Sequence, residues 1–392
     1  MKEGESMDTE KKAYLTVLTP LRGIAAIFVV MHHSSLFFGS FVPITTTAFF
    51  ENSWIWVDFF FILSGFILTY SYGNFFAKKI TIRSYKKYLQ ARFARIYPLH
   101  LFTLVWAFAA VATICYLADG IDPSLNDFFN LKAFLPSLLL IQDLHLYKSS
   151  PLNFPAWSLS AEWCTYLLFP FVVPLVLKRG VLQKILLALF VIVTYLAIYY
   201  LLGPISVAKP DGRPKINLVA DFGLLRCIAG FSAGMVLHFF YERRAGFSIL
   251  KRSASFLLFC LGAIIAIHAG VNDLLVIAFF PFLLLTAAYN ESQIKGIFSQ
   301  SILQNLGKWS FSIYMVHAPI ILMVFAYTVY KDPRAFANMT PSAADVLTMP
   351  TNYKTGLFFC GFLLTSTVAV SAFTYRFVEV PARKYLHKFS SK

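Results

Sequence analysis

The chain has 392 residues, of which 58% are hydrophobic and 14% are charged, and its mean hydropathy is +0.66. Soluble domains carry about 25% charged residues, so this composition excludes a disordered chain and an ordinary soluble enzyme. The formal net charge is +15. A basic balance can indicate nucleic-acid binding, but here the basic residues lie between apolar runs, which excludes a nucleic-acid-binding module.

Ten stretches are apolar and long enough to cross a bilayer as helices, which takes about 20 residues each. In chain order they are 14–38, 54–73, 97–118, 153–177, 183–203, 218–240, 253–270, 272–290, 309–329 and 355–376. A shorter apolar stretch, 133–141, is expected to lie at the interface or to re-enter the membrane. The sequence therefore predicts an all-α, polytopic membrane helix bundle, with a single domain over 1–392.

The basic residues between these stretches predict the orientation, because cytoplasmic loops carry an excess of Lys and Arg. If the ten stretches alternate, 24 of the 34 Lys and Arg fall on one side and 8 on the other, while Arg22 and Arg226 lie within spans. Both termini are then cytoplasmic, with tails at 1–13 and 377–392. The first stretch is not expected to be a cleaved signal peptide, because Arg22 lies inside it and acidic residues precede it.

The five Cys lie inside apolar runs, and none are spaced as C-x-x-C. An odd number of Cys at membrane depth argues against a disulfide framework and against a zinc site. We therefore expect them to be small core residues, and we expect no metal.

Seven ionisable residues inside the predicted spans are candidates for a functional site. They are Arg22, His32, His33, Asp58, Glu162, Arg226 and His317. Such residues are costly in a bilayer and indicate a functional site, with a partner for each. The alternative, that each belongs to an ion pair or hydrogen bond that only joins helices, stays open for every one of them.

Helix geometry groups some of these residues. Arg22 and His33 are separated by about three turns, so they share one helix face roughly 16 Å apart along the axis. Asp58, on the next span, reaches a depth similar to that of His33, and a carboxylate beside an imidazole fixes its tautomer. Glu162 falls in the outer half of its span. Several polar groups are thus expected to converge on one intramembrane cavity.

Arg92 and Arg95 precede the third span, in the most basic part of the chain. Their spacing puts both on one side of a helix, where they can bind phosphates through charge-assisted hydrogen bonds. The alternative is positive-inside topology with attraction to anionic lipid headgroups, and spacing alone favours this alternative.

Six segments carry recognisable motifs. They are L-R-G-I-A-A at 21–26 with M-H-H at 31–33, V-D-F-F-F-I-L-S-G-F at 57–66, R-F-A-R-I-Y-P at 92–98, W-S-L-S-A-E at 157–162, S-F-S-I-Y-M-V-H-A-P at 310–319 and F-V-E-V-P at 377–381. In this order they resemble the membrane-bound acyltransferase 3 family, which contains O-antigen and exopolysaccharide O-acetyltransferases. The chain departs from many members in having Trp163 after Glu162, where they carry a second acid.

The resemblance implies transfer of an acyl group, acetyl by default, from cytoplasmic acyl-CoA to a hydroxyl of a glycan such as O-antigen or exopolysaccharide. It also implies a multi-pass protein of a bacterial inner membrane, with acetyl-CoA as cosubstrate and membrane lipids and a glycan acceptor as partners. The sequence leaves monomer and homodimer open.

The same resemblance implies roles for individual residues. His33 is expected to be the general acid–base, with Asp58 orienting it and Glu162 holding the acceptor or helping to position His33. The expected CoA-binding residues are Arg22, Arg92 and Arg95; the expected substrate-binding residues are Trp157, Arg226 and His317; and the expected structural residues are Glu379, Ser64 and Gly65. For Trp157 the interfacial aromatic belt is the alternative, and Glu379 is expected to pair with Arg92 or Arg95.

Two questions of mechanism and class remain open. Direct transfer of the acyl group from donor to acceptor is preferred to an acyl-enzyme formed on Ser64 or Ser160, because neither serine has an evident adjacent base. A covalent acyl-histidine intermediate is possible, but nothing in the sequence requires it. The rival functions are a secondary transporter with an intramembrane proton relay and a non-catalytic partner in polysaccharide export. No inverted repeat is visible in the sequence, which argues against the transporter.

Overall fold

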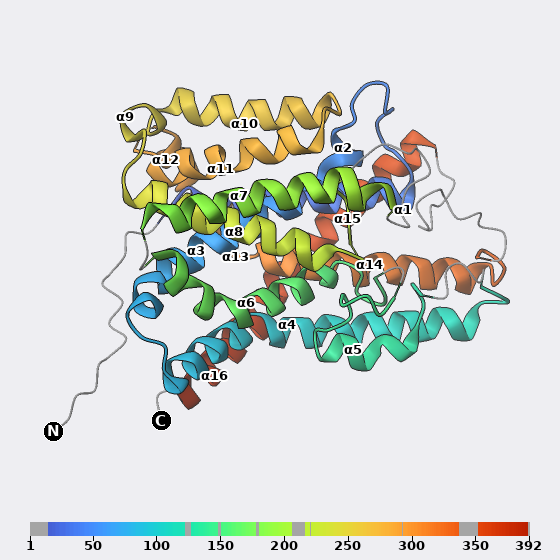
Figure 1. The fold of residues 1–392 in the computed structure, drawn as a ribbon. Helices are drawn as coiled ribbons and strands as arrows, with labels where there is room; N and C mark the ends of the chain where they lie inside the picture. The colour runs from blue at the N-terminus through green and yellow to red at the C-terminus, as the bar shows by residue number, and fades with distance from the viewer. Residues whose placement is uncertain are drawn as a thin grey trace.

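The computed structural model describes residues 15–121, 127–147, 150–177, 180–205, 216–219, 221–291, 293–336 and 352–390, and in these ranges it contains helices and no strand (Figure 1). The predicted all-α class is therefore confirmed. The predicted tail at 1–13 lies outside the described residues.

In the described part of the chain, eight helical segments are long and apolar enough to cross a membrane. Five are single helices, and the other three each join several consecutive helical elements. The segments are α1 (Leu18–Phe38), α2–η1–α3 (Phe49–Asn52, Ser53–Ile55, Trp56–Lys78), α4 (Ile82–Leu117), α6 (Ala156–Leu177), α7–η4–η5 (Val181–Ala197, Ile198–Leu202, Gly203–Ile205), α8 (Gly223–Glu242), α14 (Ser310–Lys331) and α15–η6–α16 (Tyr353–Thr374, Tyr375–Glu379, Val380–Ser390).

The remaining described helices are shorter. Two of them, α10 (Ser253–His268) and α11 (Asp273–Tyr289), are apolar and coincide with the seventh and eighth predicted spans. The number of spans and the cytoplasmic position of both termini remain predictions. The others are η3 (Leu131–Ala133), α5 (Phe134–Leu138), α9 (Phe247–Leu250), α12 (Gln293–Phe298) and α13 (Ser301–Lys308).

Helix α4 begins well before the third predicted span. Thr81 and Ser84 form a capping box, in which each side chain accepts a hydrogen bond from the other residue's backbone N–H. Lys, Arg and Gln, which favour helix, fill the following turns. The basic segment is therefore the first part of a 36-residue helix, and Arg92 and Arg95 both lie on it.

Helices α3 and α8 cross closely because glycines face each other's backbone. A Cβ at Gly65 would overlap the carbonyl oxygen of Phe231, and one at Gly234 would overlap that of Ile62. Small residues that let backbones approach are typical of helix contacts in membranes. Figure 1 shows the resulting arrangement, with the pair α10 and α11 along one edge and α4 with α5 along the other.

The stretch 133–141 forms α5 and a turn, and it is too short to span the bundle, as predicted. The chain then folds inward: residues 151–160 are all buried. Leu140 and Leu152 have positive φ angles of 57° and 56°, a conformation that costs energy for a branched residue. The start of α6 is thereby held deep inside the bundle.

Candidate active site

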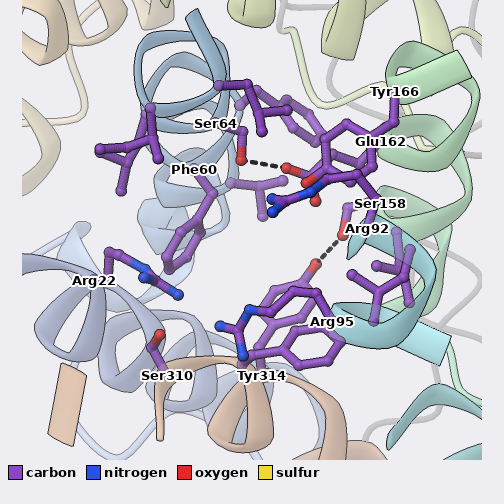
Figure 2. Close-up of a pocket in the computed structure, with 18 residues that line it drawn as sticks. Arg22, Phe60, Ser64, Arg92, Arg95, Ser158, Glu162, Tyr166, Ser310 and Tyr314 are labelled. Carbon is purple, nitrogen blue, oxygen red and sulfur yellow. Dashed lines mark hydrogen bonds between the residues drawn. The ribbon is translucent and has the colours of Figure 1, made fainter. Parts of the chain in front are cut away.

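A cavity of about 180 Å³ lies between α1, α3, α4, α6 and α14. Figure 2 shows polar side chains from all five helices lining it. The lining includes five of the residues selected from the sequence, which are Arg22, Ser64, Arg92, Arg95 and Glu162. Residues of five of the six motifs thus meet at one cavity.

One of the three arginines is neutralised within the protein. The guanidinium of Arg95 forms a 2.7 Å ion pair with the carboxylate of Glu379, whose side chain is 2% exposed. Ser312 donates a hydrogen bond to the same carboxylate, and Arg383 lies 3.6 Å from it. Glu379 therefore has the structural position that was expected, on one of the two α4 arginines.

The other two arginines keep their charge available to the cavity. Among the described residues, neither Arg22 nor Arg92 forms a hydrogen bond or ion pair with a carboxylate. Arg92 donates a long hydrogen bond of 3.4 Å to the Tyr72 hydroxyl, and its buried Nε has no partner. A concave site with unpaired guanidinium groups favours an anionic ligand.

Glu162 is the acidic group of the cavity, and Ser64 donates a hydrogen bond to it (Figure 2). The expectation that Ser64 lacks an adjacent base is therefore wrong. Glu162 also lies in the same cavity as Arg22, although it was predicted in the outer half of its span. The residues before α6 are buried loop, so the W-S-L-S-A-E motif begins inside the bundle.

The end of the cavity nearest His317 is lined by Tyr314, Ser158 and Phe60. The hydroxyls of Tyr314 and Ser158 are 2.7 Å apart, and the rings of Phe60 and Tyr314 lie 6.1 Å apart (Figure 2). The Tyr314 ring is also 6.1 Å from the ring of His317, which lies beyond it. Tyr314 was missed from the sequence, although it lies in the segment that carries His317.

His33 lies next to His317, one layer away from the cavity. Its Nδ1 is 3.1 Å from Nε2 of His317 and 3.0 Å from the carbonyl oxygen of Val29. Phe37 and Phe154 pack around its ring, at 6.2 and 5.0 Å between centroids. His317 is buried, whereas His33 is partly exposed.

Asp58 does not lie beside His33. Its carboxylate is bound by Arg226, with 3.1 Å from Nε and 2.5 Å from the terminal nitrogen, and both side chains are fully buried. Tyr195 donates to the same carboxylate, and the rings of Trp54 and Trp157 flank Arg226 at 5.0 and 5.4 Å. The prediction matched depths along two helices, and depth does not say which face of a helix meets which neighbour.

The structure therefore divides the predicted residues among three places. The cavity is lined by Arg22, Arg92, Arg95, Glu162 and Ser64. Beyond the Tyr314 end of the cavity lies the pair His33 and His317. A separate buried cluster contains Asp58, Arg226 and Trp157. Among the described residues, no group of three or more metal-ligating side chains is found.

The fold defines a multi-pass membrane protein, and a cavity between its helices is lined by three arginines. A family model described as an acyltransferase domain matches residues 18–376, and the chain belongs to this family. The family expected from the six motifs is therefore confirmed.

Curated relatives include two acyltransferases. The chain is 27% identical over 280 residues to acyltransferase MdmB of Streptomyces mycarofaciens, covering 68% of this chain and 67% of that protein. It is 25% identical over 408 residues to O-acetyltransferase OatA of Staphylococcus aureus, covering 95% of this chain and 57% of OatA. The chain thus spans little more than half of OatA. No solved structure matches the chain.

Proposed function

We propose that this protein is a membrane O-acyltransferase that moves an acyl group, acetyl by default, from acyl-CoA to a hydroxyl of a glycan. The observation that carries the proposal is the cavity in which, among the described residues, neither Arg22 nor Arg92 forms an ion pair or hydrogen bond with a carboxylate. CoA carries phosphates, and guanidinium groups bind phosphate through paired, charge-assisted hydrogen bonds.

The predicted orientation supports this assignment. Arg92 and Arg95 lie on the part of α4 that is predicted to be cytoplasmic, where CoA is found. The acyl-bearing arm then extends along the cavity from the arginines toward Tyr314. Arg22 and His33 are roughly 16 Å apart along α1, so an extended pantetheine arm held near Arg22 brings its thioester toward His33.

His33 then acts as a general acid–base. It takes the proton from the acceptor hydroxyl, whose oxygen attacks the thioester carbonyl; the carbon–sulfur bond breaks, and the leaving thiolate takes that proton. The products are an O-acyl ester and free CoA. Such a base contributes typically 10²- to 10⁴-fold to the rate. The contact at Nδ1 makes His317 the residue that orients His33, in place of Asp58.

The other cavity residues support the donor. Glu162, held by Ser64, limits the positive charge near Arg22 and orients the bound arm. Asp58, Arg226 and Trp157 stabilise the packing of α3, α6 and α8. Acceptors such as O-antigen or exopolysaccharide, and a bacterial inner membrane as the location, are part of the same proposal. Membership of an acyltransferase family favours acyl transfer over the transporter and export alternatives.

The test is release of free thiol from acetyl-CoA by the purified protein in lipid nanodiscs, with and without glycan acceptors. Wild type is compared with His33→Gln and with His145→Gln, which changes an exposed histidine outside the cavity. We expect His33→Gln to lower turnover by about 10²-fold or more and His145→Gln to leave it unchanged. Equal turnover in all three proteins would contradict the role of His33.

A further inference from the structure

Two aromatic side chains, Phe60 and Tyr314, stand at the end of the cavity nearest His317 (Figure 2). Along α14, Tyr314 is the last residue that lines the cavity, and along α6 the first is Ser158. Phe60 of α3 faces Tyr314, with 6.1 Å between the ring centroids and 65° between the ring planes. In the predicted orientation of the helices, this is the outer end of the cavity. We refer to Phe60 and Tyr314 as the outer wall.

The ring of Tyr314 is held in place by its neighbours. Its hydroxyl donates a hydrogen bond to the carbonyl oxygen of Pro155, at 3.1 Å, and lies 2.7 Å from the hydroxyl of Ser158. The ring of His317, which is fully buried, lies 6.1 Å from the Tyr314 ring. Moving Tyr314 outward would break hydrogen bonds inside the bundle and press the ring against a close-packed neighbour. The outer wall therefore does not widen easily.

The position of the outer wall bears on the length of the acyl group. In the proposed function the pantetheine arm occupies the cavity between the arginines and Tyr314, so the acyl group at its end reaches the outer wall. Acetyl ends there in a methyl group, whereas a longer acyl group adds methylenes. The arm fills the space behind, so these methylenes would have to displace one of the two rings. Inserting methylenes into a packed site costs free energy.

We infer that Phe60 and Tyr314 are specificity-determining residues that restrict the donor to short acyl groups and exclude chains as long as hexanoyl. This inference rests on the proposed function and deepens it, because it names the length of the acyl group and the side chains that set it. The two rings act by occupying space, and neither takes part in proton transfer.

The experiment is titration of acetyl-CoA and of hexanoyl-CoA against the purified protein in nanodiscs, with the signal from protein-free nanodiscs subtracted. The readout is the ratio of the two Kd values within each protein, which does not depend on how much of a variant is folded. For wild type, we expect the Kd of hexanoyl-CoA to be at least about 10-fold higher than that of acetyl-CoA. Phe60→Ala and Tyr314→Ala each open the outer wall, and each is expected to make the two Kd values about equal.

Ile67→Ala is the matched control. Ile67 lines the same cavity from the same face of α3, two turns or roughly 10 Å from Phe60 toward the predicted cytoplasmic end. Its replacement also removes a bulky apolar side chain, but at a distance from the outer wall. The ratio of the two Kd values is therefore expected to stay as in wild type.

The possible outcomes separate the inference from the proposed function. Equal Kd values for the two thioesters in wild type overturn the inference, and so does a wild-type ratio in either variant of the outer wall. A ratio that falls in Ile67→Ala as far as in Phe60→Ala also overturns it, because the acyl group would then not lie at the outer wall. Absence of acetyl-CoA binding to wild type overturns the proposed function itself.

Discussion

Replacing Arg92 by Gln should weaken binding of acetyl-CoA. Arg92 lies on the cavity wall, its Nε has no partner, and its hydrogen bond to Tyr72 is 3.4 Å long. Little internal structure is therefore lost with the guanidinium, whereas a contact with phosphate is lost completely. The substitution tests the donor site with limited damage to the fold.

The magnitude follows from the type of contact. A hydrogen bond to a charged group contributes about 1.5–3 kcal/mol, which corresponds to an approximately 10- to 150-fold higher Kd. A charge that acts only through the overall potential of a basic surface contributes less to acetyl-CoA affinity. Salt weakens that contribution, because it screens exposed charges that are more than roughly 10 Å apart. A local contact and a general potential therefore predict different results.

Arg83→Gln is the matched control. Arg83 is exposed, and it lies on the same helix, α4. Both variants lose one positive charge, but only Arg92 lines the cavity. The assay is titration of acetyl-CoA against the protein in nanodiscs, at low and at physiological salt.

We expect Arg92→Gln to lose at least about 10-fold in affinity at both salt concentrations. Arg83→Gln is expected to lose little, and only at low salt. Equal losses in the two variants, both abolished by salt, would show that the basic segment acts through topology and surface charge. The donor site would then have to lie elsewhere.

Three substitutions test the buried framework by thermal unfolding in nanodiscs. Asp58→Asn leaves Arg226 buried without a counter-charge and is expected to cost about 3–5 kcal/mol. Gly234→Ala places a methyl group against the carbonyl oxygen of Ile62 and is expected to cost about 1–3 kcal/mol. Burial, reinforced by Asp221, raises the pKa of the Asp143 carboxyl, so its contribution to stability falls as pH rises through the raised pKa. Asp143→Asn should flatten that pH dependence and stabilise the protein by about 1–3 kcal/mol at the alkaline end of a series from about pH 5 to 8.

Asp119→Asn is a common control, because Asp119 and its partner Arg334 are both exposed. Such surface changes usually stay within about 0.5 kcal/mol. An Asp58 variant as stable as this control would remove the Asp58–Arg226 pair from the framework. A Gly234 variant of wild-type stability would contradict close α3–α8 contact. An Asp143 variant whose stability follows pH in parallel with wild type would contradict the raised pKa.

The sequence predicted the helical fold and several of the residues that line the cavity. Apolar length located the helices, because a bilayer sets the length of a spanning segment. The predicted start of the third span, at residue 97, does not match the start of α4 at Ile82. Hydropathy does not detect a helix that continues from an apolar span into basic residues. The six motifs placed Arg22, Arg92, Arg95 and Glu162 among the site candidates, and these four meet at the cavity.

Pairing between helices was not predictable in the same way. Spacing along a helix gives depth and face, but it does not say which neighbour that face meets. Asp58 was therefore matched with His33, whereas it binds Arg226 on α8. The Ser64–Glu162 contact joins α3 to α6 and was missed for the same reason.

The central claim is that acyl-CoA binds in the arginine-lined cavity with its thioester directed toward His33. The most direct test is a structure of the protein in nanodiscs with a non-transferable thioether analogue of acetyl-CoA. We expect the CoA phosphates within hydrogen-bonding distance of Arg22 or Arg92, and the sulfur at the Tyr314 end of the cavity. An analogue bound outside this cavity, or bound with its phosphates at the Tyr314 end, would contradict the account.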